Sequence, residues 1–397
     1  MYKDSVYKKC KDHNSSVRVL KEIGKSDLSE LLSLSGRSML VSGGSARERS
    51  KILCRAVSYA KANSPCPCII LSNNAETERE LISLANANKL GPLYVCSEQY
   101  PEYDVFSGMS GVTVSSVFCM VGELLGYRNT SNVHNYSMAF LKLLNMTSGD
   151  RASLSDILAF KRNNKDAVIA GHAKSLGLEE EYSALSDPDA AKDFRNILRV
   201  IENAFSLLTT DSCKSCFSLI NSLSSNAVIY IRTSTEHPEV LGAYFAAVLG
   251  SVCEKSFSLY LDDCRMLGSD KFIESIVLLK MMPGVTVNLF SKNASLYGSE
   301  ELISSYPGSI ILLDGEGVES SSIQQLFDKC FGEYTAYDVG AGASKPAHVL
   351  FSLERSPQIN TLAYTRPKLL FEETVGYSAV IKGHNGPEIR LVRKLKM

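Results

Sequence analysis

Residues 256–263 read SFSLYLDD, an apolar run that ends in two adjacent carboxylates, Asp262 and Asp263. The run has the length and composition of a short buried strand. In a sheet that binds nucleotides, such a strand presents one carboxylate that orders Mg²⁺ beside another that polarises water. The stretch therefore predicts Asp262 as a metal ligand and Asp263 as a catalytic carboxylate. The alternative is a solvated acidic turn, or a negative charge placed ahead of the following helix.

A candidate phosphate-binding loop occupies residues 43–50, GGSARERS, directly after an apolar run that predicts a strand. The loop has the length of a G-x-x-x-x-G-K-[ST] motif, and it keeps the first glycine as Gly43 and the last hydroxyl as Ser50. Glu48 stands in place of the second glycine, and Arg49 stands in place of the lysine. The length and the two end residues of a phosphate loop are present, but two residues that contact phosphate are replaced.

Both substitutions bear on phosphate binding. Arg49 supplies positive charge in a longer, planar side chain, which is not equivalent to lysine. Glu48 puts a side chain where bare backbone is needed, and its carboxylate repels phosphate oxygens. If the loop binds ATP, the Ser50 hydroxyl is expected on Mg²⁺. The full set of expected contacts in this loop is Gly43, Gly44, Ser45, Arg49 and Ser50. The alternative is an ordinary turn from a strand into a helix.

Alternating strands and helices predict an α/β fold with a mainly parallel, doubly wound sheet. The expected strands lie at 39–41, 68–71, 93–96, 227–231, 257–261, 285–289, 309–313 and 347–352. The expected helices between them lie at 48–62, 76–89, 238–253, 270–281 and 320–331. Residues 112–222 instead carry helix-period apolar residues, which predicts an all-α insertion domain. We therefore expect an N-terminal extension over 1–35, with a short helix near 26–34, and one nucleotide-binding domain built from 36–111 and 223–397.

The end of the chain predicts a β-hairpin. Two strand-like runs, at 377–381 and 389–393, flank Asn385-Gly386, a dipeptide typical of tight hairpin turns. A cluster of basic residues lies in the same part of the chain, at Arg390, Arg393, Lys394 and Lys396. Cations in such a place more often form a solvated edge than a nucleic-acid groove, so any DNA contact must be local.

Composition narrows the class of protein. With 397 residues, of which 45% are hydrophobic, the chain can bury a large core and exceeds the usual size of one domain. Its net charge of −1 excludes the global positive field of a basic nucleic-acid-binding domain. Eleven scattered cysteines favour a reducing, cytoplasmic location, and we expect no membrane segment because no apolar run approaches about 20 residues. No G-x-S-x-G motif supports a hydrolase triad.

The stretch over 259–331 resembles the TraG/TraD-type coupling proteins of conjugative type IV secretion systems. Leu261-Asp262-Asp263 matches the family's LDE-like strand end, and Leu296-Tyr297-Gly298 matches its Leu-Tyr-Gly turn. Further out, residues 72–76 match its Asp-Pro-Lys-Gly-Glu turn and residues 103–106 its Tyr-Asn-Pro-Phe segment. The resemblance extends over about 36–395. It implies a RecA-like, P-loop ATPase fold that uses ATP and Mg²⁺, assembles as a homo-hexamer, and docks relaxosome and other secretion-system proteins at the inner face of the membrane.

The resemblance also assigns individual residues. It places Ser50 and Asp262 on Mg²⁺ and puts Asp263 where the family has a catalytic glutamate, one methylene longer. A water held by the shorter acid is less well placed, and errors near 1 Å can matter about 100-fold. Asn288 and Lys292 are the two candidates for a polar sensor on the next strand.

Together with the altered loop, the shorter acid predicts a diverged ATPase with weak or lost hydrolysis in a DNA-transfer machine. The alternative is a non-catalytic pseudo-ATPase scaffold or adaptor that recruits protein partners. A nucleotide-dependent small-molecule enzyme is disfavoured, because no acid, base or nucleophile set accompanies the loop.

Overall fold

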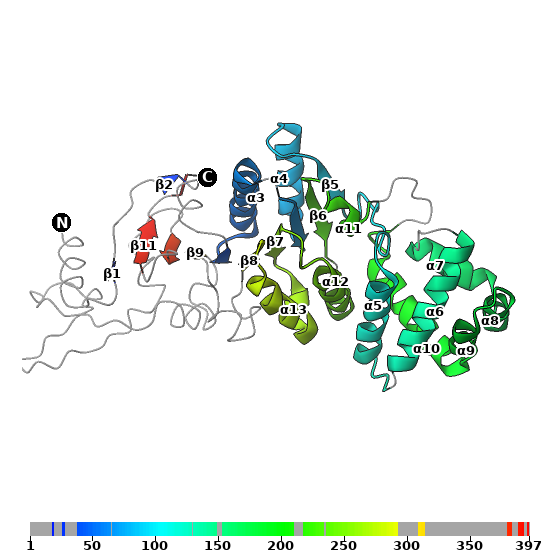
Figure 1. Cartoon of the computed structure of the whole chain (residues 1–397). Coiled ribbons are helices and arrows are strands. Elements are labelled where there is room, and N and C mark those ends of the chain that lie inside the picture. The colour runs from blue at the N-terminus through cyan, green and yellow to red at the C-terminus, as the bar shows by residue number, and fades with distance from the viewer. Residues whose placement is uncertain are drawn as a thin grey trace, which may run out of the picture. The chain divides into compact units, whose positions relative to one another are not determined.

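The structure is a computed structural model, shown in Figure 1. It describes residues 18–19, 26–27, 38–64, 66–128, 130–148, 153–209, 217–233, 236–292, 309–313, 379–382, 388–392 and 395–396. The chain divides into two compact units. The first unit combines Met1–Ala60 with Asn288–Met397, and the second is Lys61–Val287. The division runs through strand β8 (Val285–Ser291), and each unit is described by itself.

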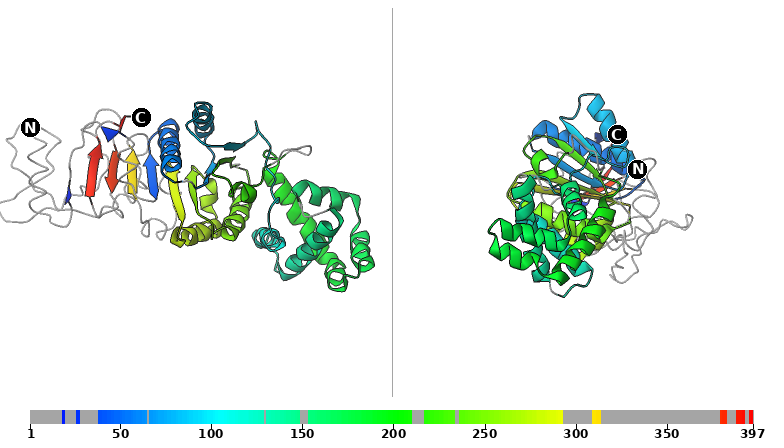
Figure 2. Two further views of the ribbon diagram at one scale, coloured as in Figure 1. Left: turned by 45° about the horizontal axis from the view of Figure 1, so that its top comes forward. Right: turned by 90° about the vertical axis from the view of Figure 1, so that its right-hand side faces the viewer.

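The first unit is built on β3 (Met39–Gly43), which is buried at every position. In this unit β3 lies between β8 and β9 (Ser309–Leu313) and is parallel to both. Apolar residues at successive positions fit a strand that is covered on both faces, as in parallel sheets. Figure 2 shows β3 in blue, β9 in yellow, and the red strands β10 and β11 beyond it, in one row. Helix α3 (Ala46–Asn63) follows β3 directly.

The predicted C-terminal hairpin is confirmed. Strands β10 (Ala379–Lys382) and β11 (Glu388–Val392) pair antiparallel, with Ala379 opposite Val392. Strand β10 also pairs antiparallel with β9, which joins the hairpin to the parallel strands. The edge of this sheet is extended by β1 (Arg18–Val19), which pairs with β11.

The predicted helix near 26–34 is wrong at its first residues. Ser26–Asp27 forms a short strand, β2, that pairs parallel with β12 (Leu395–Lys396). Ladder hydrogen bonds to another strand require an extended backbone, and here that pairing overrides the capping signal of the Ser-Asp pair. Residues 28–37 lie outside the described residues, as do the predicted strand at 347–352, the predicted helix at 320–331 and the Leu-Tyr-Gly turn at 296–298.

The second unit contains four parallel strands in the order β7-β4-β6-β5. Their bounds are β4 (Cys68–Ser72), β5 (Leu93–Cys96), β6 (Val228–Arg232) and β7 (Phe257–Asp262). Helix α4 (Ala75–Asn86) follows β4, and α12 (Pro238–Ser251) connects β6 to β7. A 3₁₀ turn, η1 (Arg265–Gly268), and helix α13 (Asp270–Met281) follow β7. Strands that alternate with helices and pair in parallel confirm the predicted α/β class.

Between β5 and β6, the described residues of the second unit form helices. They are α5 (Gly111–Leu124), α6 (Thr130–Ser148), α7 (Leu154–Asn163), α8 (Asp166–Ser175), α9 (Glu179–Leu185), α10 (Pro188–Phe205) and α11 (Leu219–Ser222). Figure 1 shows α6 to α10 gathered beside α5. Phe118 of α5 stacks on Phe194 of α10 with ring centroids 4.5 Å apart, so an aromatic core joins them. Whether 112–222 is a separate domain stays a prediction.

Helix α5 connects these helices to the sheet, because it also packs against α12. At this junction the hydroxyls of Tyr103 and Tyr244 lie 2.7 Å apart, and Tyr244 donates to the carbonyl of Val105 over 2.5 Å. Both tyrosines are fully buried, and burial raises the pKa of each phenol above its ordinary value. In the part of the chain that the structure describes, no helix has both the length and the apolar character needed to cross a membrane.

Candidate functional site

The loop between β3 and α3 contains two glycines in the left-handed region. Gly43 has a φ of 88° and Gly44 a φ of 65°. Side chains with a Cβ are strained at such angles, so this turn depends on glycine. The loop therefore has the backbone form of a tight strand-to-helix turn, and it delivers Ser45 to the N-terminus of α3.

Ser45 and Glu48 form a reciprocal capping box at that N-terminus. The backbone N–H of Ser45 donates to Oε2 of Glu48 over 2.7 Å, and the N–H of Glu48 donates to Oγ of Ser45 over 3.3 Å. Serine with glutamate three residues later is a common way to satisfy the open N–H groups of a helix start. The Glu48 carboxylate is thus the anion bound at the N-terminus of α3.

Arg49 faces inward rather than towards a ligand. Its side chain is 1% exposed, and Nη1 donates to the carbonyls of Gly43 at 3.0 Å and Gly44 at 2.7 Å. These bonds satisfy carbonyls that the left-handed glycines leave inside the turn. The guanidinium therefore holds the loop closed upon itself.

Ser50 lies one residue further along α3 and is also buried. Its hydroxyl has no hydrogen-bond partner among the described residues, and the same holds for the Ser42 hydroxyl at the end of β3. A buried hydroxyl of this kind is what a Mg²⁺ ligand at this position requires. Ser50 and Gly43 are the two positions at which the loop keeps the residues of the motif without alteration.

The loop as a whole does not fit a triphosphate. A phosphate loop offers its backbone N–H groups and one cation to phosphate oxygens. Here the Ser45 N–H is bonded to Glu48, and the cation of Arg49 is bonded to backbone carbonyls. Glu48 was expected to crowd the loop. Its carboxylate instead binds the Ser45 N–H, where a phosphate oxygen would bind in a phosphate loop.

Asp262 belongs to the second unit, where it ends β7 and is fully buried. Its Oδ2 accepts hydrogen bonds from Oγ of Ser72 at 2.8 Å and from Oγ1 of Thr77 at 2.6 Å. Ser72 is its register partner on β4, and its hydroxyl also accepts from the N–H of Asn74 at 3.0 Å. The carboxylate therefore ties the end of β7 to the turn that begins α4.

Asp263 follows with a φ of 47°, in the left-handed region, and is half-exposed. Aspartate and asparagine tolerate this conformation better than other residues with a side chain. The strand thus ends in a sharp turn before η1. The acidic pair is divided between a buried, bonded carboxylate and one that solvent reaches.

Of the two sensor candidates, Asn288 takes part in a structural bond within the first unit. Its Oδ1 accepts from the backbone N–H of Met39 at 3.1 Å, and the residue is 4% exposed. Asn288 therefore lies beside the start of β3, whereas Lys292 directly follows the carboxyl end of β8. Ligands of parallel sheets bind at the carboxyl ends of strands, so Lys292 has the better position for a sensor.

Ser72 and Thr77 were missed from the sequence as partners of the acidic strand. Ser72 lies in the segment that resembles a family turn and Thr77 directly follows it, but nothing in their own spacing connects them to Asp262, which is 185 residues from Thr77. The capping box, in contrast, was readable, since S-x-x-E ahead of a helical pattern is its signature.

Comparison with known proteins gives structural but no sequence matches. No family model and no curated protein sequence matches the chain. The bacterial conjugative coupling protein TrwBdeltaN70, in an unbound form, is similar with a TM-score of 0.55 and 12% identity, over 95% of this chain and 89% of that one. The plasmid coupling protein TrwB in complex with ADP and Mg²⁺ gives a TM-score of 0.53 at 12% identity, over 95% and 90%.

The same plasmid coupling protein in complex with the GTP analogue GDPNP gives a TM-score of 0.52 at 12% identity, over 99% of this chain and 92% of that one. The likeness spans nearly the whole of both chains, although few residues are identical. It agrees with the parallel strands and flanking helices described above. The chain therefore has the α/β fold of the conjugative coupling protein TrwB.

Proposed function

We propose that this chain is a coupling-protein-like component of a conjugative or type IV secretion DNA-transfer machine, with weak or lost ATP hydrolysis. Support for the machine comes from the likeness to TrwB over nearly the full length of both chains. Such a likeness extends to the helices between β5 and β6 as well as to the sheet. A shared fold supports a function only by analogy, so the evidence for or against ATP hydrolysis has to come from the residues of the site.

The observation that carries the loss of hydrolysis is the closure of the β3–α3 loop by its own side chains. Glu48 bonds the Ser45 N–H, and Arg49 bonds the carbonyls of Gly43 and Gly44. A triphosphate would have to displace the Glu48 carboxylate and turn the Arg49 guanidinium out of its buried position. Both changes cost free energy that nucleotide binding must supply.

The remaining site residues stay predictions. Ser50 and Asp262 are the residues that would hold Mg²⁺, and Asp263 the one that would orient water, if a nucleotide were bound. TrwB has been observed with ADP and Mg²⁺ bound, which supports ATP and Mg²⁺ as the ligands of an ancestral site. Because the loop does not fit a triphosphate, we derive no catalytic step from these residues.

A second candidate function is a pseudo-ATPase scaffold that recruits secretion-system or relaxosome proteins without using nucleotide. The Glu48 and Arg49 bonds favour this role too, because they stabilise the loop in a closed form. In either role we expect self-association, as a hexamer by the family resemblance, and a cytoplasmic position at the membrane through partner proteins. DNA contact is expected to be local.

Substitution of Asp263 separates the two roles. Asp263→Asn removes the charge, and asparagine keeps the left-handed backbone that the turn needs. We measure phosphate release from ATP and, in cells that carry the chain in place of the native copy, DNA transfer. The scaffold predicts no phosphate release by either protein and unchanged transfer. A residual motor predicts that the variant loses both release and transfer.

The coupling role itself is tested by deletion of the gene. If the deleted strain transfers DNA and secretes substrates as the parent does, the machine assignment is wrong, whatever the nucleotide results. If transfer fails and returns with the intact gene, the assignment stands. This arm does not depend on the β3–α3 loop.

A further inference from the structure

A basic pocket lies between α7 and α10, in the second unit. It has a volume of about 400 Å³. The charged side chains that line it are Lys161, Arg162, Lys192, Arg195, Arg199 and Glu202. Five cations against one carboxylate is a strong local excess in a chain with a net charge of −1. Such an excess needs a physical reason, because like charges repel and destabilise the fold that gathers them.

Helix α10 supplies three of these cations from one exposed face. Lys192, Arg195 and Arg199 follow one another at intervals of three and four residues, so they stand on one side of the helix. The opposite side is buried in the core, with Phe194 and Ile197 fully covered. The exposed face of this amphipathic helix therefore carries a row of cations along the pocket.

The Lys161 side chain is buried in the pocket and is held in place by hydrogen bonds. Its side chain is only 6% exposed, and Nζ donates to the hydroxyl of Tyr136 and to Oδ1 of Asp166, each at 2.6 Å. It also lies 5.0 Å from the ring centroid of Tyr136 and 5.5 Å from that of Phe194. Burial lowers the pKa of Lys161, and the hydrogen bond that Lys161 donates to Asp166 opposes that shift. An ammonium has three N–H donors, and the bonds described use two of them.

The other cations of the pocket keep capacity for a ligand. Arg162 pairs with Glu202 at 2.7 Å and Arg195 with Asp166 at 3.0 Å, and each guanidinium has further donors. Among the described residues, no carboxylate lies within ion-pair distance of Lys192 or Arg199. The pocket thus holds two exposed cations whose charge is not neutralised by a neighbour.

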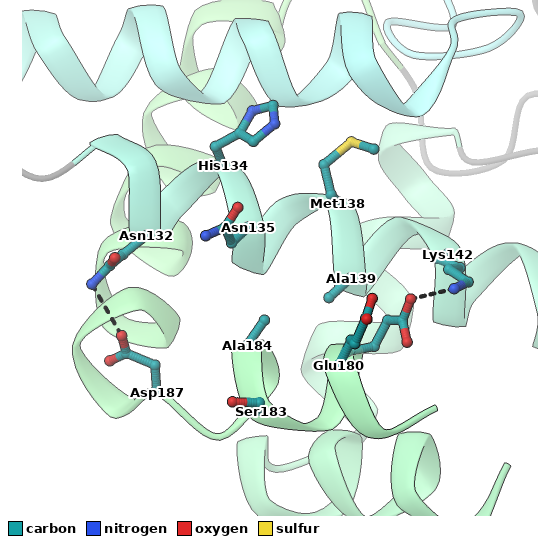
Figure 3. Close-up of a pocket in the computed structure, with 11 residues that line it drawn as sticks. Asn132, His134, Asn135, Met138, Ala139, Lys142, Glu180, Ser183, Ala184 and Asp187 are labelled. Atoms are coloured by element: carbon teal, nitrogen blue, oxygen red, sulfur yellow. Dashed lines mark hydrogen bonds and ion pairs between the residues drawn. The ribbon is translucent and has the colours of Figure 1, made fainter. Parts of the chain in front are cut away.

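The larger pocket between α6 and α9 gives a contrast. It has a volume of about 680 Å³, and Figure 3 shows its residues facing one another across the two helices. Its cation Lys142 is paired with Glu181, and Asn132 donates to Asp187 at 3.2 Å. That pocket has three carboxylates, Glu180, Glu181 and Asp187, against the one cation Lys142, so its lining is acidic, and the excess of positive charge belongs to the α7–α10 pocket.

We propose that the α7–α10 pocket is a docking site for an acidic segment of a partner protein. Carboxylates of that segment pair with Lys192 and Arg199, and further ones accept from the guanidiniums of Arg162 and Arg195. Apolar side chains of the segment contact Leu158, which is half-buried in the lining of the pocket. The site is independent of nucleotide binding at the β3–α3 loop.

A peptide fits these features better than a nucleic acid does. A nucleic-acid backbone is bound along an extended positive groove, whereas this charge is confined to one small pocket with Leu158 in its lining. The guanidinium group of arginine binds carboxylates as well as phosphates, so it does not separate the two ligands. The leucine in the lining does, because an apolar side chain gains nothing from contact with a phosphate backbone. An amphipathic acidic segment satisfies both halves of the lining.

The test uses the full chain and a fluorescein-labelled peptide of repeated Glu-Leu-Glu units, with binding followed by fluorescence anisotropy. The test variant is Lys192→Glu with Arg199→Glu, two exposed positions whose side chains form no hydrogen bond or ion pair with the other described residues. The control is Lys89→Glu with Arg55→Glu, which makes the same charge change at exposed positions outside both the pocket and the β3–α3 loop. Thermal unfolding of each variant checks that the fold is kept.

We expect saturable peptide binding that weakens about tenfold or more in the test variant and less than about twofold in the control. If both variants weakened peptide binding equally, the loss would follow from the net charge of the protein rather than from the pocket, and the proposal would be overturned. It would also be overturned by the absence of binding, or by a labelled single-stranded oligonucleotide that binds in the pocket while the peptide does not compete. A peptide with serine in place of leucine should bind several-fold more weakly, and equal binding would contradict the role of Leu158.

Discussion

The Glu48 carboxylate accepts a 2.7 Å hydrogen bond from the backbone N–H of Ser45, so the N-terminus of α3 is capped by a residue of its own first turn. Glu48→Ala should lower the free energy of unfolding by about 0.5–2 kcal/mol, because the Ser45 N–H loses its acceptor while the N–H of residue 48 keeps the Ser45 hydroxyl. Urea denaturation at neutral pH measures the change.

Glu48→Gln is the matched control, since glutamine can also accept from the Ser45 N–H. It should keep most of the stability that alanine loses. If Glu48→Ala is as stable as the wild type, the carboxylate does not cap the helix, and the closed loop loses its main support.

The buried Asp262 carboxylate should be worth more to stability than an exposed one. Asp262→Ala leaves the hydroxyls of Ser72 and Thr77 without their shared acceptor, so we expect a loss of about 2–4 kcal/mol. Thr77→Val removes one donor and keeps the shape, and should cost about 1–2 kcal/mol. A double variant with the sum of both losses would show that the pair does not interact.

The two phenols at the junction of α12 with the segment before α5 should differ in their effects. Tyr244 donates to the Val105 carbonyl, so the bond between the phenols is donated by Tyr103. Tyr244→Phe leaves a buried donor and a buried carbonyl unpaired, at about 2–3 kcal/mol, while Tyr103→Phe should cost about 1 kcal/mol. Chemical denaturation of both variants measures the order, and the reverse order would contradict this direction of donation.

Lys280 on α13 should make stability depend on pH above neutrality. Burial lowers its pKa from 10.5 to about 8, because desolvation disfavours the charged form. Between these two values the unfolded chain binds more protons than the native one, so stability should rise with pH through this window. Lys280→Met should be more stable than the wild type near pH 7 and lack that rise. A parallel pH profile for both proteins would contradict the assignment.

Local pattern was enough to predict most of the sheet. The runs at 68–71 and 285–289 became β4 and β8, and the apolar run before Asp262 became β7, because buried parallel strands are apolar along their whole length. The C-terminal hairpin was predicted from a different signal, the Asn385-Gly386 dipeptide between two strand-like runs. The Ser26–Asp27 strand was not, because its pairing partner lies at the far end of the chain.

The candidate site was predicted in position but not in its bonding. Sequence spacing identified Glu48 and Arg49 as the residues that depart from a phosphate loop, yet it could not show that each turns onto the backbone of the loop. Nor could it show that Asp262 is held by Ser72 and Thr77, since those contacts depend on the register of β4 against β7. Motif reasoning identifies which residues differ, and only geometry gives the partners that they acquire.

Glu48 and Arg49 close the phosphate loop by bonding its backbone. Isothermal calorimetry with Mg²⁺-ATP tests this closure, on the wild type and on Glu48→Gly with Arg49→Lys, which restores the G-x-x-x-x-G-K-S pattern over 43–50. We predict no saturable binding by the wild type and measurable binding by the double variant. Saturable wild-type binding that Asp262→Asn weakens, in protein that remains folded, would contradict this closure.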